Sequence, residues 1–92
     1  MGSEVAVVIK VLPDEPGVDL DKIAEDIKKA LPPEYKLMRY EKEPIAFGLE
    51  ALKLLIFMPE DFEGGTSQLE NIIKKVNRVS EVEILMVTRM TL

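Results

Sequence analysis

The segment from Glu4 to Leu12 constrains the fold most, because it is apolar on both of its faces. One face carries Val5, Val7, Ile9 and Val11, and the other carries Ala6, Val8, Lys10 and Leu12. A strand with two largely apolar faces is typical of the centre of a sheet that is covered on at least one side. We therefore expect a central strand with other elements packed over it.

A helix is predicted after the loop that Pro13 and Gly17 introduce. Asp19 is suited to cap the first turn, and Pro32-Pro33 ends the helix because proline lacks a backbone N–H and blocks the preceding turn. Apolar residues at helical spacing lie between these signals: Leu20, Ile23, Ala24, Ile27, Ala30 and Leu31.

The rest of the chain predicts two further strands, a helix and a last strand. Tyr35 to Glu43 is a charged strand suited to a sheet edge, and Leu49 to Met58 is a strongly apolar strand. Ser67 to Glu70 has the form of a capping box that starts the second helix. We expect the last strand over Glu81 to Met90, with three apolar residues on one side: Val82, Ile84 and Met86.

The order β-α-β-β-α-β with right-handed crossovers predicts the α+β ferredoxin-like plait. It has a four-stranded antiparallel sheet in the order 4-1-3-2 and two helices on one face. We expect residues 1–92 to form one domain of this kind.

The relative directions of the strands bear on function. We expect the first and third strands to run in parallel, with the second and fourth against them. The Phe47 loop and the C-terminal Met90, Thr91 and Leu92 would then lie at the same end of the domain.

Composition excludes several chemistries. The 92 residues include no cysteine and no histidine, so a disulfide, a thiolate nucleophile, a Cys/His zinc site and histidine acid–base catalysis are all excluded. The net charge of −5 disfavours nucleic acid and favours protein partners. No apolar run approaches about 18 residues and no secretory signal is visible, so we expect a cytoplasmic protein without membrane contact.

The connection between the second and third strands has an unusually apolar tip, Pro44-Ile45-Ala46-Phe47-Gly48. One interpretation is that Ile45 and Phe47 fold back and cap the core. The other is that Phe47 is an aromatic anchor for a partner's pocket, which is the usual form of an interface hot spot. The residues alone leave both open.

Other candidate sites are weaker. The glycine-containing segment from Glu63 to Ser67 is more simply a helix entry than an anion-binding nest. The loop carboxylates match no cation-binding pattern, so we expect a solvated surface and no metal: Asp14, Glu15, Glu60, Asp61 and Glu63. The three methionines Met58, Met86 and Met90 are expected to fill the core and its edge. The end of the last strand either frays or projects outward as a contact.

Two stretches of this chain resemble a known family. Pro44 to Leu49 and Ala51 to Leu54 are similar to the signature of elongation factor 1-beta, the guanine-nucleotide exchange factor for the GTPase elongation factor 1-alpha. The acidic Pro59-to-Gly65 loop, Gly65-Thr66 and the hydrophobic last residue are also similar. The resemblance covers essentially the whole chain and is closest to the short archaeal form.

The resemblance implies an exchange factor that inserts the hairpin tip and the C-terminal segment near the nucleotide and Mg²⁺ site of elongation factor 1-alpha. It implies no catalytic residue, cofactor or bound metal. Eukaryotic members have a penultimate lysine where this chain has Thr91, and the nearest cation is Arg89. The implied partner-binding residues are Pro44, Ile45, Ala46, Phe47, Gly48, Arg89, Met90, Thr91 and Leu92.

Other functional classes compete with this interpretation. Ferredoxin-like domains also serve as small-molecule-sensing regulatory modules, which is the main alternative. A phosphatase of the acylphosphatase kind needs an arginine and an asparagine that the Leu12-to-Gly17 loop lacks. RNA binding through the sheet is disfavoured, since the first and third strands lack paired exposed aromatic residues.

Overall fold

A computed structural model describes residues 4–60 and 65–90 of the chain. This part contains the predicted elements in the predicted order: β1 (Glu4–Pro13), α1 (Leu20–Ala30), β2 (Lys36–Ala46), β3 (Leu49–Pro59), α2 (Gly65–Lys74) and β4 (Val79–Met90). Among the strands, the largest shift of a boundary is at the end of β2. This strand continues three residues beyond the expected end at Glu43, because Ala46 still pairs with Leu49.

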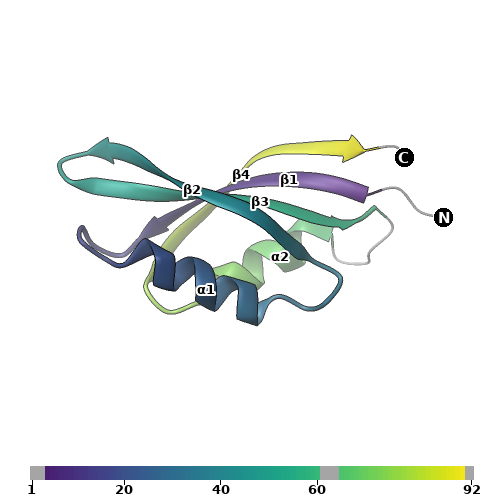
Figure 1. The fold of residues 1–92 in the computed structure, drawn as a ribbon, viewed down its shortest axis with the longest axis horizontal. Coiled ribbons are helices and arrows are strands. Elements are labelled where there is room, and N and C mark those ends of the chain that lie inside the picture. The colour runs from purple at the N-terminus through teal and green to yellow at the C-terminus, as the bar shows by residue number, and fades with distance from the viewer. Residues whose placement is uncertain (1–3, 61–64, 91–92) are drawn as a thin grey trace.

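The four strands form one sheet in the order β2-β3-β1-β4, which is the predicted 4-1-3-2 order from the other edge. Both helices lie on the same face of this sheet (Figure 1). The arrangement is the α+β ferredoxin-like plait, so the predicted fold class is confirmed. We call the sheet face that carries no helix the open face.

The predicted direction of the strands is wrong. β1 runs antiparallel to both of its neighbours, β3 and β4. The physical reason lies in the crossovers, because a strand–helix–strand unit returns the chain in its original direction. β2 therefore runs with β1, the hairpin reverses β3, and the second crossover makes β4 run with β3.

The core lies between the sheet and the two helices. Alternate residues of β1 and β3 face the helices and pair across the strands, as Val7 with Ile56 and Ile9 with Leu54 do. Both helices contribute apolar side chains from one face each. The residues buried in this core are Val7, Ile9, Val11, Leu20, Ile23, Ala24, Ile27, Tyr35, Leu52, Leu54, Ile56, Met58, Leu69, Ile73 and Val76.

The helix boundaries confirm one capping prediction and contradict the other. The Asp19 carboxylate accepts a hydrogen bond from the backbone N–H of Lys22 at 3.2 Å, so Asp19 caps α1 as expected. The capping box at Ser67 to Glu70 is wrong, because α2 already begins at Gly65 and Ser67 lies inside it. A serine within the first turn cannot hold the cap position that precedes the helix.

β4 contains an irregularity that changes which side chains share a face. Ile84 lies opposite Ile9, whereas Met86 lies opposite Val8, so the register shifts by one residue at Leu85. Ile9 faces the helices and Val8 faces the open side. The prediction that Val82, Ile84 and Met86 share one side is therefore wrong for Met86, because a bulge reverses the alternation.

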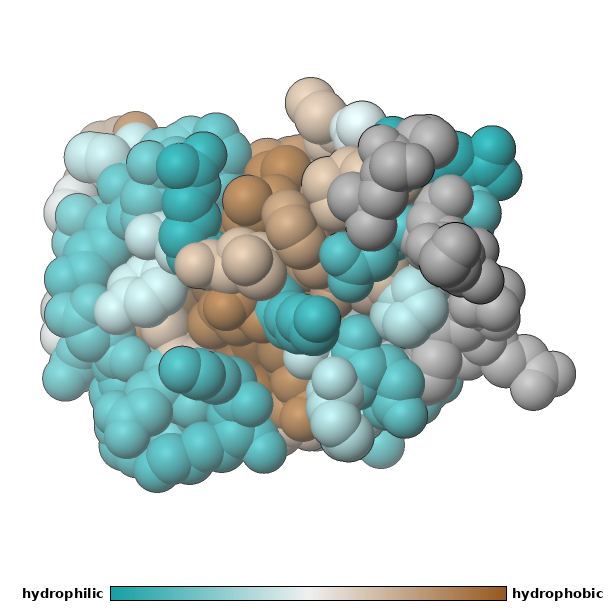
Figure 2. Space-filling model, turned by 45° about the vertical axis from the view of Figure 1, so that its right-hand side comes forward, coloured by the Kyte–Doolittle hydropathy of each residue, from teal (hydrophilic) through white to brown (hydrophobic). Residues whose placement is uncertain are grey.

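Large apolar side chains also remain at the surface. Figure 2 shows apolar atoms in a band across one face of the molecule, beside hydrophilic surface. The exposed large apolar residues are Met38, Tyr40, Ile45, Phe47, Leu85, Met86 and Val87. Met58 is buried in the core as expected of a filler, whereas Met86 is 57% exposed. None of the helices described is long and apolar enough to cross a membrane.

Two adjacent leucines of β3 test whether the core lies on only one face of the sheet. Leu54 faces the helices and is almost completely buried, whereas Leu55 lies half-buried on the open face. We expect Leu54→Ala to lower the free energy of unfolding by about 3 kcal/mol and Leu55→Ala by about 1 kcal/mol. Urea denaturation measures both values. Equal losses at the two positions would contradict the one-sided core.

Candidate functional site

The tip of the β2–β3 hairpin is a two-residue turn. Ala46 and Leu49 pair across the strands, and Phe47 and Gly48 connect them. Their φ angles are +53° and +78°, so both central residues lie in the left-handed region. Two consecutive left-handed residues are typical of the type I′ turn, whose twist matches that of the flanking strands. Asparagine and glycine are the usual residues of such a turn, so Phe47 holds a position that favours a small residue.

Phe47 is completely exposed, with a relative accessibility of 102%. Ile45 is 43% exposed, and Pro44, Ala46 and Gly48 also lie at the surface. The interpretation that the tip caps the core is therefore wrong for Phe47. The turn points the ring away from its own chain, and an exposed aromatic side chain in this position is well placed to anchor a partner.

A polar cluster connects the base of this hairpin to helix α1. The Tyr40 hydroxyl donates to Asp21 Oδ1 at 2.9 Å, and the Lys42 ammonium donates to Asp21 Oδ2, also at 2.9 Å. Tyr40 and Lys42 lie two residues apart on β2, so both project from the side of the sheet that carries the helices. The cluster links the outer strand of the hairpin to the first turn of α1.

This cluster was not identified from the sequence. The sequence feature that could have indicated it is the spacing of Tyr40 and Lys42, which places two hydrogen-bond donors on one face of a strand. Their acceptor is 19 residues away from Tyr40 along the chain. Only the packing of α1 against β2 brings it within reach.

The other candidate region is the end of β4. Met90 lies opposite Glu4 at the start of β1, and Arg89 forms an ion pair with Glu60, which follows β3. Glu4 is also opposite Pro59 at the end of β3. β3 and β4 therefore end together beside the start of β1. Thr91 and Leu92 lie outside the described residues.

The two candidate regions lie at opposite ends of the molecule, so the prediction that they share one end is wrong. The hairpin tip follows the end of β2, whereas Met90 lies beside the start of β1 (Figure 1). The cause is that β4 runs in the same direction as β3, because both are antiparallel to β1. β3 starts at the tip, so β4 ends at the opposite end of the sheet. The longest dimension of the molecule, 45 Å, runs between these ends.

The weaker candidates gain no geometric support. Within residues 4–60 and 65–90, no group of three or more acidic side chains is placed to hold a metal ion. Asp14 and Glu15 instead pair with Arg78. Three residues of the acidic loop and the possible anion-binding nest lie outside the described residues: Asp61, Glu63 and Gly64.

The cluster at Asp21 predicts a measurable titration. The hydrogen bond from Lys42, and then that from Tyr40, lowers the pKa of the Asp21 carboxyl below its ordinary value. Its contribution to stability is therefore present above the pKa of the unfolded chain and is lost as the pH falls through the folded pKa. We expect Lys42→Met to raise the pKa of Asp21 in an NMR titration of the carboxyl groups. Superimposable Asp21 curves in the two proteins would contradict this ion pair.

The left-handed conformation of Phe47 predicts a gain of stability on substitution. Phe47→Asn places the residue that this turn prefers, so the free energy of unfolding should rise by about 1 kcal/mol. Ile45→Asn is the matched control, because Ile45 has no positive φ and gains nothing from asparagine. Thermal and urea denaturation measure both variants. A Phe47→Asn protein that is less stable than the unmodified chain would contradict the assignment of backbone strain to this position.

Comparisons with known proteins show the family of this chain. The family model described as the EF-1 guanine nucleotide exchange domain matches residues 6–90. Elongation factor 1-beta of Staphylothermus marinus is 52% identical over 89 residues, which cover 97% of this chain and 99% of that protein. The protein of the same name from Thermofilum pendens is 51% identical over 87 residues, which cover 95% and 96%. That from Saccharolobus solfataricus is 49% identical over 88 residues, which cover 96% and 97%. The chain belongs to the family of EF-1 guanine nucleotide exchange domains.

Proposed function

We propose that this chain is a translation elongation factor that promotes the exchange of GDP for GTP on the GTPase elongation factor 1-alpha. Its relatives carry the name elongation factor 1-beta, and the matching family model describes an exchange domain. The observation that carries the proposal is the fully exposed Phe47 on its left-handed turn. A large apolar side chain kept in water and in a strained conformation is best explained by a partner that buries it.

Exchange of this kind needs no covalent chemistry. A factor that binds the nucleotide-free GTPase more tightly than the loaded GTPase lowers the affinity for nucleotide by the same coupling free energy. The contacts must therefore be ones that the nucleotide or its Mg²⁺ opposes. A chain without histidine or cysteine is fully suited to this task.

The opposite positions of the two candidate regions shape the proposal. The tip, Pro44 to Gly48, contacts one part of the GTPase, and the end of β4 contacts another. The second contact is formed by Arg89 and Met90, followed by Thr91 and Leu92 outside the described residues. One domain then spans two separate surfaces of its partner along its long axis. The proposed exchange domain comprises residues 1–92 and acts in the cytoplasm, without direct contact to nucleic acid or membrane.

Arg89 is the cation closest to the C-terminus, and Glu60 already holds its guanidinium. In our proposal the end of β4 approaches the nucleotide and Mg²⁺ site, where Arg89 supplies positive charge. The Glu60 contact orients the guanidinium before binding. Because the Arg89 side chain is 68% exposed, it is accessible to a partner without unfolding of the strand.

Release of labelled GDP tests the exchange activity. The cognate GTPase is loaded with fluorescent GDP, and the release rate is measured in excess unlabelled nucleotide with and without this protein. We expect the intact chain to accelerate release. Phe47→Ala should reduce this acceleration about tenfold or more, since loss of a buried aromatic anchor costs at least that factor in affinity.

A second variant distinguishes loss of the Phe47 anchor from a general loss of exposed apolar surface. Met38→Ala is the matched control, because Met38 is a 50% exposed apolar residue on the same strand outside the tip. It should keep the activity. No acceleration by the intact chain would overturn the proposed function. Equal losses in the Phe47 and Met38 variants would overturn the role of the tip alone.

A further inference from the structure

The edge strand β2 carries four charged side chains on the open face of the sheet. In chain order they are Lys36, Arg39, Glu41 and Glu43. We call these four residues the β2 row. Their partners on β3 are every second residue from Phe57 to Ala51, so the four charges are evenly spaced at about 6.8 Å along the sheet. The bulge at Met38 makes the first interval equal to the others, because it adds a residue to β2 without advancing the pairing.

The signs of the β2 row are antisymmetric about its midpoint. Two cations are followed by two carboxylates, and the midpoint lies at Tyr40. If β2 pairs antiparallel with a copy of itself around Tyr40, every cation lies opposite a carboxylate. Arg39 then lies opposite Glu41 of the second copy, and Lys36 lies opposite Glu43 of the second copy. Because two-fold symmetry forms each contact twice, the strand pair contains four pairs of opposite charge.

The β2 row has no partners within its own domain. None of its four side chains forms a hydrogen bond or an ion pair with residues 4–60 or 65–90. Neighbouring charges on the helix-bearing side are paired, as Lys42 is with Asp21. All four charges of the row are therefore available to a second molecule.

The backbone of β2 is also available on its outer side. In the described part of the chain, β2 pairs with β3 and with no other strand. Charged side chains usually prevent pairing between exposed edges, since a copy brings like charges together. The antisymmetric order of the β2 row removes that protection. Pro44, which has no backbone N–H to donate, lies just beyond the row and outside the pairing.

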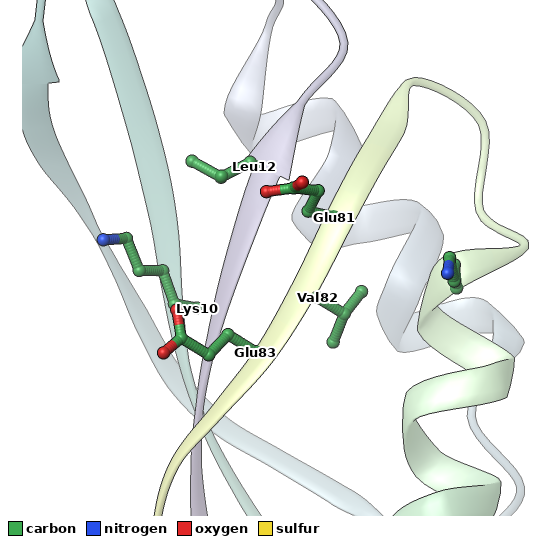
Figure 3. Close-up of a pocket in the computed structure, with 6 residues that line it drawn as sticks. Lys10, Leu12, Glu81, Val82 and Glu83 are labelled. Atoms are coloured by element: carbon green, nitrogen blue, oxygen red, sulfur yellow. The ribbon is translucent and has the colours of Figure 1, made fainter.

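The other edge strand, β4, lacks such a pattern. Its open-face carboxylates, Glu81 and Glu83, lie opposite Leu12 and Lys10 and project toward β1, whereas Val82 points to the other side (Figure 3). The remaining described residues of β4 on this face are uncharged: Met86, Thr88 and Met90. A copy of β4 would therefore bring no cation opposite these carboxylates on this face. The two edges differ, and only β2 is complementary to itself in charge.

Uncharged residues of β2 fit the same arrangement. Met38 is 50% exposed and Tyr40 is 40% exposed, so both have surface that a second copy can cover. Pairing around Tyr40 places the two tyrosines opposite each other on the helix-bearing side. Aromatic pairs across neighbouring strands stabilise a sheet. The hydrogen bond from the Tyr40 hydroxyl to Asp21 already orients this side chain.

Stacking of two open faces about the same midpoint would form the same four charge pairs. It would also place Lys53 against Leu55 and Lys10 against Val8 of the second copy, because these residues occupy adjacent steps of β3 and β1. Burial of ammonium groups against apolar side chains carries a large desolvation cost. Pairing along the edge leaves Lys10 and Lys53 in water. The charges therefore favour edge pairing over stacking of the faces.

From these observations we infer that two copies of this chain associate through their β2 edges. The two four-stranded sheets then form one continuous antiparallel sheet, with β2 of each copy at its centre. Each copy contributes one strand, so the dimer belongs to the class of small and weak interfaces. Phe47 lies beyond the paired row, and the end of β4 belongs to the other edge. The inference goes beyond nucleotide exchange and does not depend on it.

Sedimentation equilibrium tests the association. The unmodified protein is measured from about 10 μM to about 1 mM, the range in which a weak dimer forms. We expect the average mass to rise from that of the monomer toward that of the dimer. High salt should reduce the association, because exposed charge pairs are screened.

Exchange of the charges locates the contact. Arg39→Glu alone and Glu41→Arg alone each bring like charges opposite one another, so each should weaken association about tenfold. The double variant Arg39→Glu/Glu41→Arg exchanges the two signs and should restore association. A mixture of the two single variants should associate more tightly than either variant alone. Lys74→Glu is the control, because it changes the net charge as Arg39→Glu does but lies at the end of α2, and it should leave association unchanged.

Amide hydrogen exchange of the unmodified protein provides a readout that needs no variant. At high concentration the outward amides of Arg39 to Lys42 should exchange more slowly, because they become paired with the second copy. The amides of Leu85 to Val87 on the β4 edge should not change. Protection that appears on β4 and not on β2 would overturn the inference.

Three further results would also overturn it. The first is a protein that remains monomeric at the highest concentration. The second is a double variant and a mixture that both associate as weakly as the single variants. The third is an equal loss in Arg39→Glu and Lys74→Glu, because net charge and not the β2 row would then control association.

Discussion

The central position of β1 is the constraint on which the rest of the structure depends. β1 pairs with β3 on one side and with β4 on the other, and its helix-facing residues Val7, Ile9 and Val11 are completely buried. Both crossovers must pass over the same face to cover these side chains. The hairpin tip, the end of β4 and the open face all take their places from this arrangement.

Much of the fold follows from local patterns in the sequence. The two apolar faces of Glu4 to Leu12, the cap at Asp19 and the Pro32-Pro33 stop are local signals, and the structure agrees with each of them. The strand directions needed a different argument, namely that each crossover restores the direction of the chain. The shift at Leu85 had no local signal, because the alternation of Val82, Ile84 and Met86 is that of a regular strand.

The candidate site was likewise only partly predictable from local sequence patterns. The Phe47 tip was identifiable from its apolar residues between two strands, but its exposure depends on the backbone of the turn. A type I′ turn directs the ring outward, whereas a longer loop would let it reach the core. The cluster at Asp21 and the ion pair of Arg89 with Glu60 join residues far apart in the chain, so only the packed structure reveals them.

We propose that opposite ends of one domain contact the same GTPase. Hydrogen–deuterium exchange of the chain, alone and in complex with the nucleotide-free GTPase, tests it most directly. We expect slower exchange at Ala46 to Gly48 and at Arg89 and Met90 in the same complex, with both effects reversed by excess GDP. Protection at only one end, or protection that GDP leaves unchanged, would contradict it.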